Sequence, residues 1–236
     1  MNKRPDGRKF LELRPITYKK GYIPHAEGSC MFEMGKTKVL CVASVEEKVP
    51  PFLVGSGNGW ITADYAMLPR ACQDRTPRNR QIQGGRSQEI KRIIGRALRG
   101  VVDLSLIGER SITLDCDVIL ADAGTRTASI NGSYIALTQA IGWMMKNSII
   151  NKSPLIDTVG AVSVGMIGPK PLLDLCYEED KNVRMDLNVV MTGSGKFIEV
   201  QGTAEGEPCS RKEIDTLLSV AHDGIKKIIK KIKQDI

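Results

Sequence analysis

Two arginines in this sequence follow glycines at points where a helix is expected to begin. They end the segments Gly84-Gly85-Arg86 and Gly124-Thr125-Arg126. The first turn of a helix carries unpaired backbone N–H groups and the positive end of the helix dipole, so it attracts phosphate. Arginine adds a planar fork that matches two phosphate oxygens. Either segment alone is more simply interpreted as a capped helix with an exposed arginine, but the two together predict a phosphate-binding site.

Two aspartates, Asp180 and Asp186, flank the entry to an expected strand. Two carboxylates that face one site can hold a divalent cation, or one can transfer a proton while the other orients it. The neighbouring Glu178 and Glu179 weaken this signal, because acidic clusters in turns are usually solvated. Asp186 is the more specific of the pair, since it directly precedes the apolar strand residue Leu187.

Arginines dominate the stretch from residue 70 to residue 99, and the last three of them share the helix face opposite an apolar stripe. This one-sided charge fits a polyanion bound through its backbone, whereas a solvated face would more often mix both signs. The formal net charge of +7 also agrees with an anionic partner. The stretch therefore predicts nucleic-acid contacts by Arg70, Arg75, Arg78, Arg92, Arg96 and Arg99.

The lysines near the end of the chain have a simpler interpretation. They complement the dipole of the last helix and are expected to stay solvated. These residues are Lys226, Lys227, Lys230, Lys231 and Lys233.

Several classes of protein are disfavoured by what the sequence lacks. No G-x-x-x-x-G-K-[ST] loop is present, which argues against a nucleotide triphosphatase. Six cysteines without a C-x-x-C pair, and only two histidines, argue against a zinc site and a disulfide framework. The N-terminus is polar and no apolar run reaches membrane-spanning length, so we expect a cytoplasmic protein without membrane contact.

Strands and helices alternate in a way that places these residues at element ends. Apolar positions at helical spacing predict a helix from Arg86, small residues crowd a second helix after Gly124, and Ser210 with Glu213 forms a capping box for a third. Strands are expected at 29–32, 37–45, 60–68, 111–121, 158–166, 171–177, 184–192 and 196–203. The strands come in hairpins, so the pattern indicates an α+β fold with mixed sheets. We expect one domain, 1–236, with related halves of about 1–150 and 151–236.

Long segments of the chain resemble the ribonuclease PH family. The similarity runs from about residue 4 to residue 225 and is carried by RPDGR (4–8), RSQEIKRIIGRALRGVVDL (86–104), DCDVILADAGTRTASING (115–132) and DLNVVMTGSGKFIEVQGTAEG (186–206). A further matching stretch is TKVLCVASVEEKVPPFLVGSGNGWITADYAMLPR (37–70).

This resemblance implies a ring-forming fold of the ribosomal-protein-S5-domain-2-like type, assembled as a homohexamer, a trimer of dimers. It implies inorganic phosphate as co-substrate, bound by Arg86 and by the segment Gly124-Thr125-Arg126. Catalysis is assigned to Asp180 and Asp186, with Mg²⁺ as the metal that the pair holds. The arginines at positions 70, 75 and 78 correspond to family arginines that serve ring assembly and RNA contact.

The sequence departs from the family pattern at three places. Ala123 stands where glycine is expected, Ser87 stands where threonine is usual, and the loop between Arg78 and Arg86 is about two residues short. None of these changes removes a phosphate-binding residue.

The expected activity is phosphorolytic 3′→5′ trimming of transfer-RNA precursors, a transfer-RNA nucleotidyltransferase reaction. Phosphate replaces water as the nucleophile, the products are nucleoside 5′-diphosphates, and the reverse reaction adds nucleotides to RNA 3′ ends. One alternative is a non-catalytic RNA-binding ring subunit. A second is a hydrolytic 3′ exonuclease, which commonly needs more carboxylates around two metals than this sequence offers.

Overall fold

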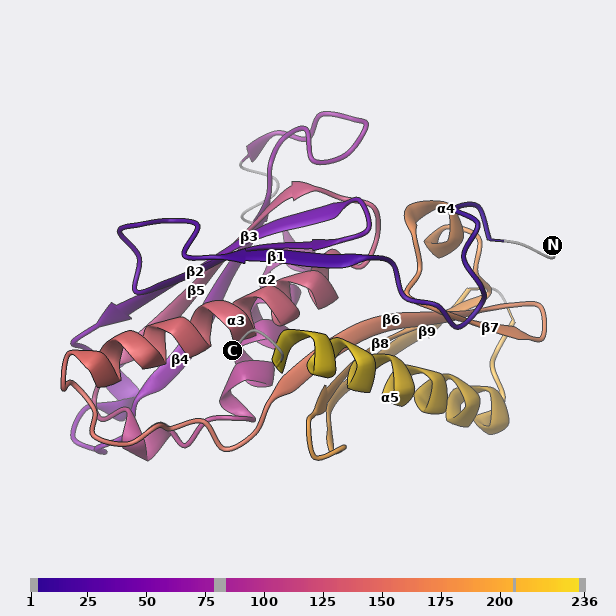
Figure 1. Ribbon diagram of the computed structural model, residues 1–236. Coiled ribbons are helices and arrows are strands. Elements are labelled where there is room, and N and C mark those ends of the chain that lie inside the picture. The colour runs from indigo at the N-terminus through magenta and orange to yellow at the C-terminus, as the bar shows by residue number, and fades with distance from the viewer. Residues whose placement is uncertain (1–3, 79–83, 206, 234–236) are drawn as a thin grey trace.

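A computed structural model describes residues 4–78, 84–205 and 207–233 of the chain (Figure 1). Two sheets form the framework. The first has the strand order β1-β2-β3-β5-β4, in which only β4 and β5 run parallel. Its strands are β1 Ile16–Lys20, β2 Gly28–Met34, β3 Thr37–Glu46, β4 Trp60–Met67 and β5 Ser111–Leu120.

The second sheet is antiparallel throughout, with the order β7-β6-β8-β9. Its inner strand β6 is buried along almost its whole length, which explains why its residues are apolar or small. The strands are β6 Val159–Ile167, β7 Lys170–Leu173, β8 Met185–Thr192 and β9 Phe197–Ala204.

Four α-helices are described, together with the 3₁₀ turns η1 Pro51–Leu53 and η2 Leu104–Leu106. They are α2 Gly85–Arg99, α3 Thr125–Lys146, α4 Tyr177–Asp180 and α5 Arg211–Lys233. Helix α3 packs against β2 and β3 on one side and against β6 on the other, while α5 covers the opposite face of β6 (Figure 1). The layers are therefore sheet, helix, sheet, helix, and α3 lies at the centre.

The central position of α3 explains its many small residues. A methyl group on Gly132 would come within 2.7 Å of the Cys41 Sγ atom and 2.9 Å of the Phe32 Cβ atom. Likewise, a Cβ atom on Gly28 of β2 would lie 2.0 Å from the Ala136 carbonyl oxygen. The close approach of helix and sheet thus depends on glycine from both elements.

The predicted α+β class is confirmed, with the first sheet mixed and the second antiparallel, and the capping box at Ser210 and Glu213 is present. The expected strand at 171–177 is wrong in its second half, where the chain leaves β7 at Leu173 and forms the short helix α4. The structure adds one strand, β1, to those expected. Within the described residues, no helix is long and apolar enough to cross a lipid bilayer.

Candidate active site

The first turn of α2 presents Arg86 to solvent. Its N-cap, Gly84, has extended backbone and no side-chain cap, and the turn holds no acidic residue. Arg86 is exposed and makes no ion pair or hydrogen bond with any residue in the described part of the chain. A cation at the positive end of a helix dipole is unfavourable without an anion nearby, so this turn is suited to bind one.

The first turn of α3 offers its backbone N–H groups in the same way. The N-cap is Gly124, in the left-handed conformation with φ 62°, and no side chain caps the turn. Thr125 is thus the first helical residue and not the cap. Its buried hydroxyl lies 2.8 Å from the hydroxyl of Tyr65 on β4. Ala123, which precedes the N-cap Gly124, also has a positive φ of 54°, and this explains why glycine is expected at position 123.

Arg126 is half-buried and held by two neighbours. It donates a hydrogen bond to the Gln201 side chain on β9, and its Nη1 atom lies 3.6 Å from the Glu89 Oε1 atom on α2. Gln201 in turn donates to Glu89 at 2.5 Å. This network joins α2, α3 and β9 and fixes the direction of the guanidinium group.

The two aspartates lie within electrostatic range of Arg126, and Asp180 lies within range of Arg86 as well. Asp180 ends α4 and Asp186 is the second residue of β8. Both Arg86 and Arg126 lie close enough to Asp180 to favour its charged form electrostatically. The structure therefore brings the two helix starts and the carboxylate pair into one site, although they come from four different elements.

Burial raises the pKa of Asp180 above its ordinary value, and the charges of Arg86, Arg126 and Arg14 only partly offset that rise. Burial also raises the pKa of Asp186, and the nearby charge of Asp180 raises it further. Perturbed carboxylates of this kind are typical of functional sites. Tyr65 has a raised pKa as well, because it is buried beneath the α3 turn.

The arginines predicted to contact nucleic acid differ in their surroundings. Arg92 is exposed and has no partner among the residues that the structure describes. Arg96 forms an ion pair with Glu199. Arg99 stacks 4.2 Å from the centre of the Trp60 ring and donates to the Ile61 carbonyl at 2.7 Å, so its guanidinium is engaged within the protein.

The remaining candidates, Arg70, Arg75 and Arg78, are exposed in the segment after β4. Arg78 is near enough to Asp117 to favour its charged form. The part of the shortened loop at 79–83 lies outside the described residues.

Several residues of this site carry no local sequence signal. Tyr65 lies 60 positions from Thr125, and Gln201 lies 75 positions from Arg126. Arg14 is 160 positions from its carboxylate partner, Asp174. Such residues become visible only when the fold brings distant segments together, and no spacing rule would have selected them.

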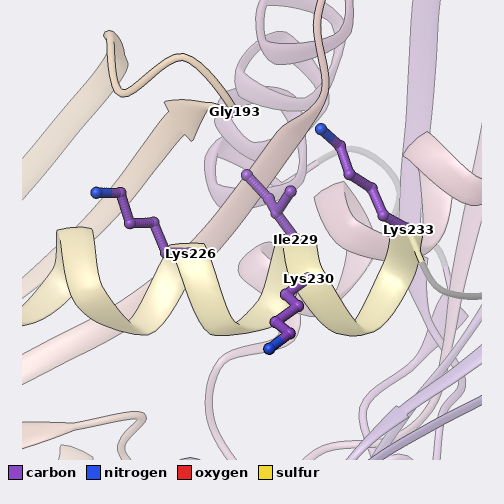
Figure 2. Close-up of a pocket in the computed structure, with 5 residues that line it drawn as sticks. All are labelled: Gly193, Lys226, Ile229, Lys230 and Lys233. Atoms are coloured by element: carbon purple, nitrogen blue, oxygen red, sulfur yellow. The ribbon is translucent and has the colours of Figure 1, made fainter.

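A separate hollow of about 370 Å³ lies beside α5 (Figure 2). In this view Lys226 and Lys233 extend on the same side as Ile229, whereas Lys230 points the opposite way. The charged groups therefore do not converge on one point, which agrees with the interpretation of these lysines as solvated. The hollow is lined by Gly193, Lys226, Ile229, Lys230 and Lys233.

Comparison with known proteins assigns the family. Residues 12–141 match the model described as "3′ exoribonuclease family, domain 1", and residues 157–224 match domain 2 of the same family. The chain belongs to the 3′ exoribonuclease family. The first match contains β4, α2 and the start of α3, and the second contains α4 and β8, so the candidate site draws on both.

Curated relatives in this family are similar over nearly their full length. A protein named Ribonuclease PH from Bacillus velezensis is 53% identical over 234 residues, covering 98% of this chain and 96% of the relative. Another of the same name from Moorella thermoacetica is 51% identical, covering 98% and 93%.

Solved exosome chains share the fold. A chain of the Archaeoglobus fulgidus exosome, solved with RNA bound to the active site, has a TM-score of 0.84 at 23% identity, covering 98% of this chain and 92% of that one. A chain of an archaeal exosome core has a TM-score of 0.79 at 22% identity, with the same coverage. The predicted ribonuclease PH fold is thus confirmed.

Proposed function

We propose that this chain shortens RNA from its 3′ end by phosphorolysis and trims the 3′ ends of transfer-RNA precursors in the cytoplasm. The observation that carries the proposal is that the charges of Arg86 and Arg126, from the first turns of two helices, both act on Asp180, in a member of the 3′ exoribonuclease family. The relatives named Ribonuclease PH, at 53% and 51% identity, support the same activity.

Inorganic phosphate is the proposed nucleophile, bound between Arg86 and the segment Gly124-Thr125-Arg126. The two guanidinium groups and the amides of the α3 first turn would neutralise its charge, so that it can approach the phosphodiester, which is also an anion. They would also hold it in line with the bond that breaks. Because the new diphosphate retains the bond energy, the reaction is reversible and adds nucleotides when diphosphates are abundant.

Mg²⁺ is the proposed cofactor of the carboxylate pair. Asp180 and Asp186 are close enough for the charge of one to raise the pKa of the other. No group of three or more His, Cys, Asp or Glu among the described residues could hold a metal ion, and Mg²⁺ commonly takes one or two carboxylates together with water and substrate phosphate. The pair therefore fits this ion, which would offset charge on the leaving oxygen.

One of the two aspartates has an alternative role as the acid that protonates the departing 3′ oxygen. Their raised pKa values favour a proton on the carboxyl group more than an ordinary aspartate would. The variants D180N and D186N separate the two roles. If the replaced aspartate is a metal ligand, the variant should need a higher Mg²⁺ concentration for half-maximal rate. If it is the acid, the variant should be slower at every Mg²⁺ concentration.

RNA is the proposed partner, and a homohexamer built as a trimer of dimers is the proposed assembly. Arg92 and Arg96 on α2 are proposed to contact the RNA backbone. Arg99, which was predicted with them, is left out of this proposal because its guanidinium already contacts Trp60 and the Ile61 carbonyl. Arg70, Arg75 and Arg78 are proposed to serve ring assembly and RNA contact. The similar solved chains come from exosome assemblies, one of them with RNA in its active site, which supports an RNA partner and assembly of this fold into a larger ring.

The test is to incubate the purified protein with a 3′-extended transfer RNA, with and without phosphate. Nucleoside diphosphates that appear only with phosphate are the expected products. R86A and R126A should abolish turnover, whereas R110A, which removes a surface ion pair with Glu47, should not. Monophosphates released without phosphate would identify a hydrolase, and RNA binding without any product would identify a non-catalytic ring subunit.

A further inference from the structure

Three arginines of the N-terminal segment are buried against two carboxylates that lie 160 to 175 positions further along the chain. Arg4, Arg8 and Arg14 meet Asp174 and Glu179, and no side chain of the five is more than 8% exposed. We call these five residues the N-terminal clamp. In Figure 1 the N-terminal segment passes directly beside α4.

Arg14 joins Asp174 to the α3 turn that is proposed to bind phosphate. Its backbone N–H and Nε each donate to the Asp174 Oδ2 atom, at 2.7 and 3.0 Å, and its Nη2 lies 2.6 Å from Oδ1. Its Nη1 donates to the Asp122 carbonyl at 2.5 Å. The Nη2 atom would also lie 2.9 Å from a Cβ atom placed on Gly124, so Arg14 supports that turn from inside the protein.

Arg4 holds α4 in a similar way. Its Nε and Nη2 donate to the two carboxylate oxygens of Glu179, at 2.6 and 2.5 Å, and it also donates to the carbonyls of Leu173 and Asp174, at 2.7 Å each. Glu179 accepts a hydrogen bond from the Cys176 N–H at 3.0 Å, which closes the start of α4. Asp180 is the next residue, so its position follows from that of Glu179.

A further hydrogen bond connects the segment before the α3 turn with α4. The Asp122 carboxylate accepts the Tyr177 N–H at 3.1 Å, while the carbonyl of the same residue accepts from Arg14. The α3 turn and α4 are therefore tied to each other as well as to the N-terminal segment. Each step uses a directional hydrogen bond to a charged group, which fixes geometry more tightly than apolar contact does.

Stability alone is a weak reason for such a cluster. Desolvating buried ion pairs offsets much of their attraction, and apolar residues of similar size often stabilise a protein as well or better. We propose that the N-terminal clamp is a positioning device of the active site: Arg14 sets the phosphate-binding turn, and Arg4, through Glu179, sets Asp180 opposite it. This proposal rests on the proposed phosphorolytic function.

The test compares R4K and R14K with R110K, which makes the same change in a surface ion pair. Lysine keeps the charge but loses the two-pronged fork. R14K should raise the phosphate KM at least about tenfold, because the binding turn loses its support. R4K should lower kcat about tenfold or more with little change in the phosphate KM, because a displacement near 1 Å can cost that much. Each rate is divided by the folded fraction from circular dichroism.

A clamp with only a structural role would lower the folded fraction and leave the corrected kcat and phosphate KM equal to those of R110K. That result would overturn the proposal. If R4K fails to fold, the isosteric variant E179Q of its partner takes its place and should lower kcat. If R14K fails to fold, D174N takes its place and should raise the phosphate KM. Should the wild-type protein itself release no diphosphates with phosphate, the proposed function fails instead, and the two failures are thus distinguished.

Discussion

Ala123 has the backbone conformation that suits glycine. Its φ of 54° lies in the left-handed region, where the Cβ atom of an L-residue approaches the following carbonyl. The structure keeps it there because the buried Thr37 hydroxyl donates to the Ala123 carbonyl at 2.7 Å and accepts the Asp122 N–H at 3.0 Å. The residue thus carries local strain directly before the proposed phosphate-binding turn.

A123G should stabilise the protein. Relief of the left-handed conformation is worth about 1–2 kcal/mol, and the greater freedom of glycine in the unfolded chain offsets about 0.5–1 kcal/mol of that. The expected gain in unfolding free energy is therefore up to about 1.5 kcal/mol, measured by urea denaturation. The matched change A66G, in strand β4 where φ is not positive, should destabilise. A loss of stability in A123G would contradict the strain argument.

At the level of single residues, the sequence could identify groups whose neighbours define them. The roles of Arg86 and Arg126 could be predicted because each comes just after a glycine at the start of a helix. Asp186 could be predicted because it precedes an apolar strand. The clamp residues Arg14 and Asp174 could not be predicted, since 160 positions separate them. A charged residue in a lead-in segment looks solvated until the fold buries its partner.

Helix α4 has only four residues, Tyr177–Asp180, and depends on the clamp for its position. Burial would raise the pKa of Glu179, but hydrogen bonds and charge from Arg4 outweigh it and hold the pKa below its ordinary value of 4.5. The folded state therefore binds this proton less tightly than the unfolded state does. The stability that the pair contributes is complete above pH 4.5 and is lost as the pH falls through the lower pKa of the folded state.

E179Q should remove this acid sensitivity. At neutral pH the variant should be less stable by about 3 kcal/mol, because Arg4 loses its buried carboxylate. Below pH 4.5 the melting temperature of the wild-type protein should fall more steeply than that of E179Q, so the two curves converge. Thermal melts between neutral and acidic pH measure this, and parallel curves would contradict the assignment of Glu179 as a charged partner.

The long elements follow from periodicity, and the short ones do not. Helix α2 buries Ile90, Ile94 and Leu98 as its apolar stripe indicates. Helix α3, by contrast, is buried on nearly all sides, so it has no single apolar stripe. Its many small residues indicated its close packing better than periodicity did. The strand β1 and the helix α4 have too few residues for either period to emerge. β1 is held by pairing with the neighbouring strand β2, and α4 by its contacts with the N-terminal segment.

At the scale of the whole molecule, the exposed arginines after β4 are proposed to contact another subunit. Arg75 is exposed and forms no ion pair within the described ranges, so its charge is available to another subunit. R75E should split the proposed hexamer into smaller oligomers, because like charges opposed across an interface cost several kcal/mol. Light scattering coupled to gel filtration measures the mass. R211E, at an exposed position on α5, is the control, and an unchanged mass in R75E would exclude Arg75 from the ring interface.

RNA binding by the whole molecule should depend on salt through the arginines that remain available on α2. Arg92 has no partner among the described residues, whereas Arg96 is already paired with Glu199, one turn along the same helix. A phosphate bound by Arg92 releases a counterion, so R92Q should make the plot of log affinity against log salt shallower by about 0.7–0.9. In R96Q the change should be smaller, since Glu199 already neutralises that charge.

Fluorescence anisotropy of a labelled transfer-RNA precursor, between about 50 and 200 mM salt, gives both slopes. Because the two variants remove the same guanidinium group from one helix, any difference between them comes from the ion pair with Glu199. If both slopes equal that of the wild-type protein, RNA does not follow this face of α2. The positive charge of the chain would then act through other residues, of which Arg70, Arg75 and Arg78 are the next to test by the same measurement.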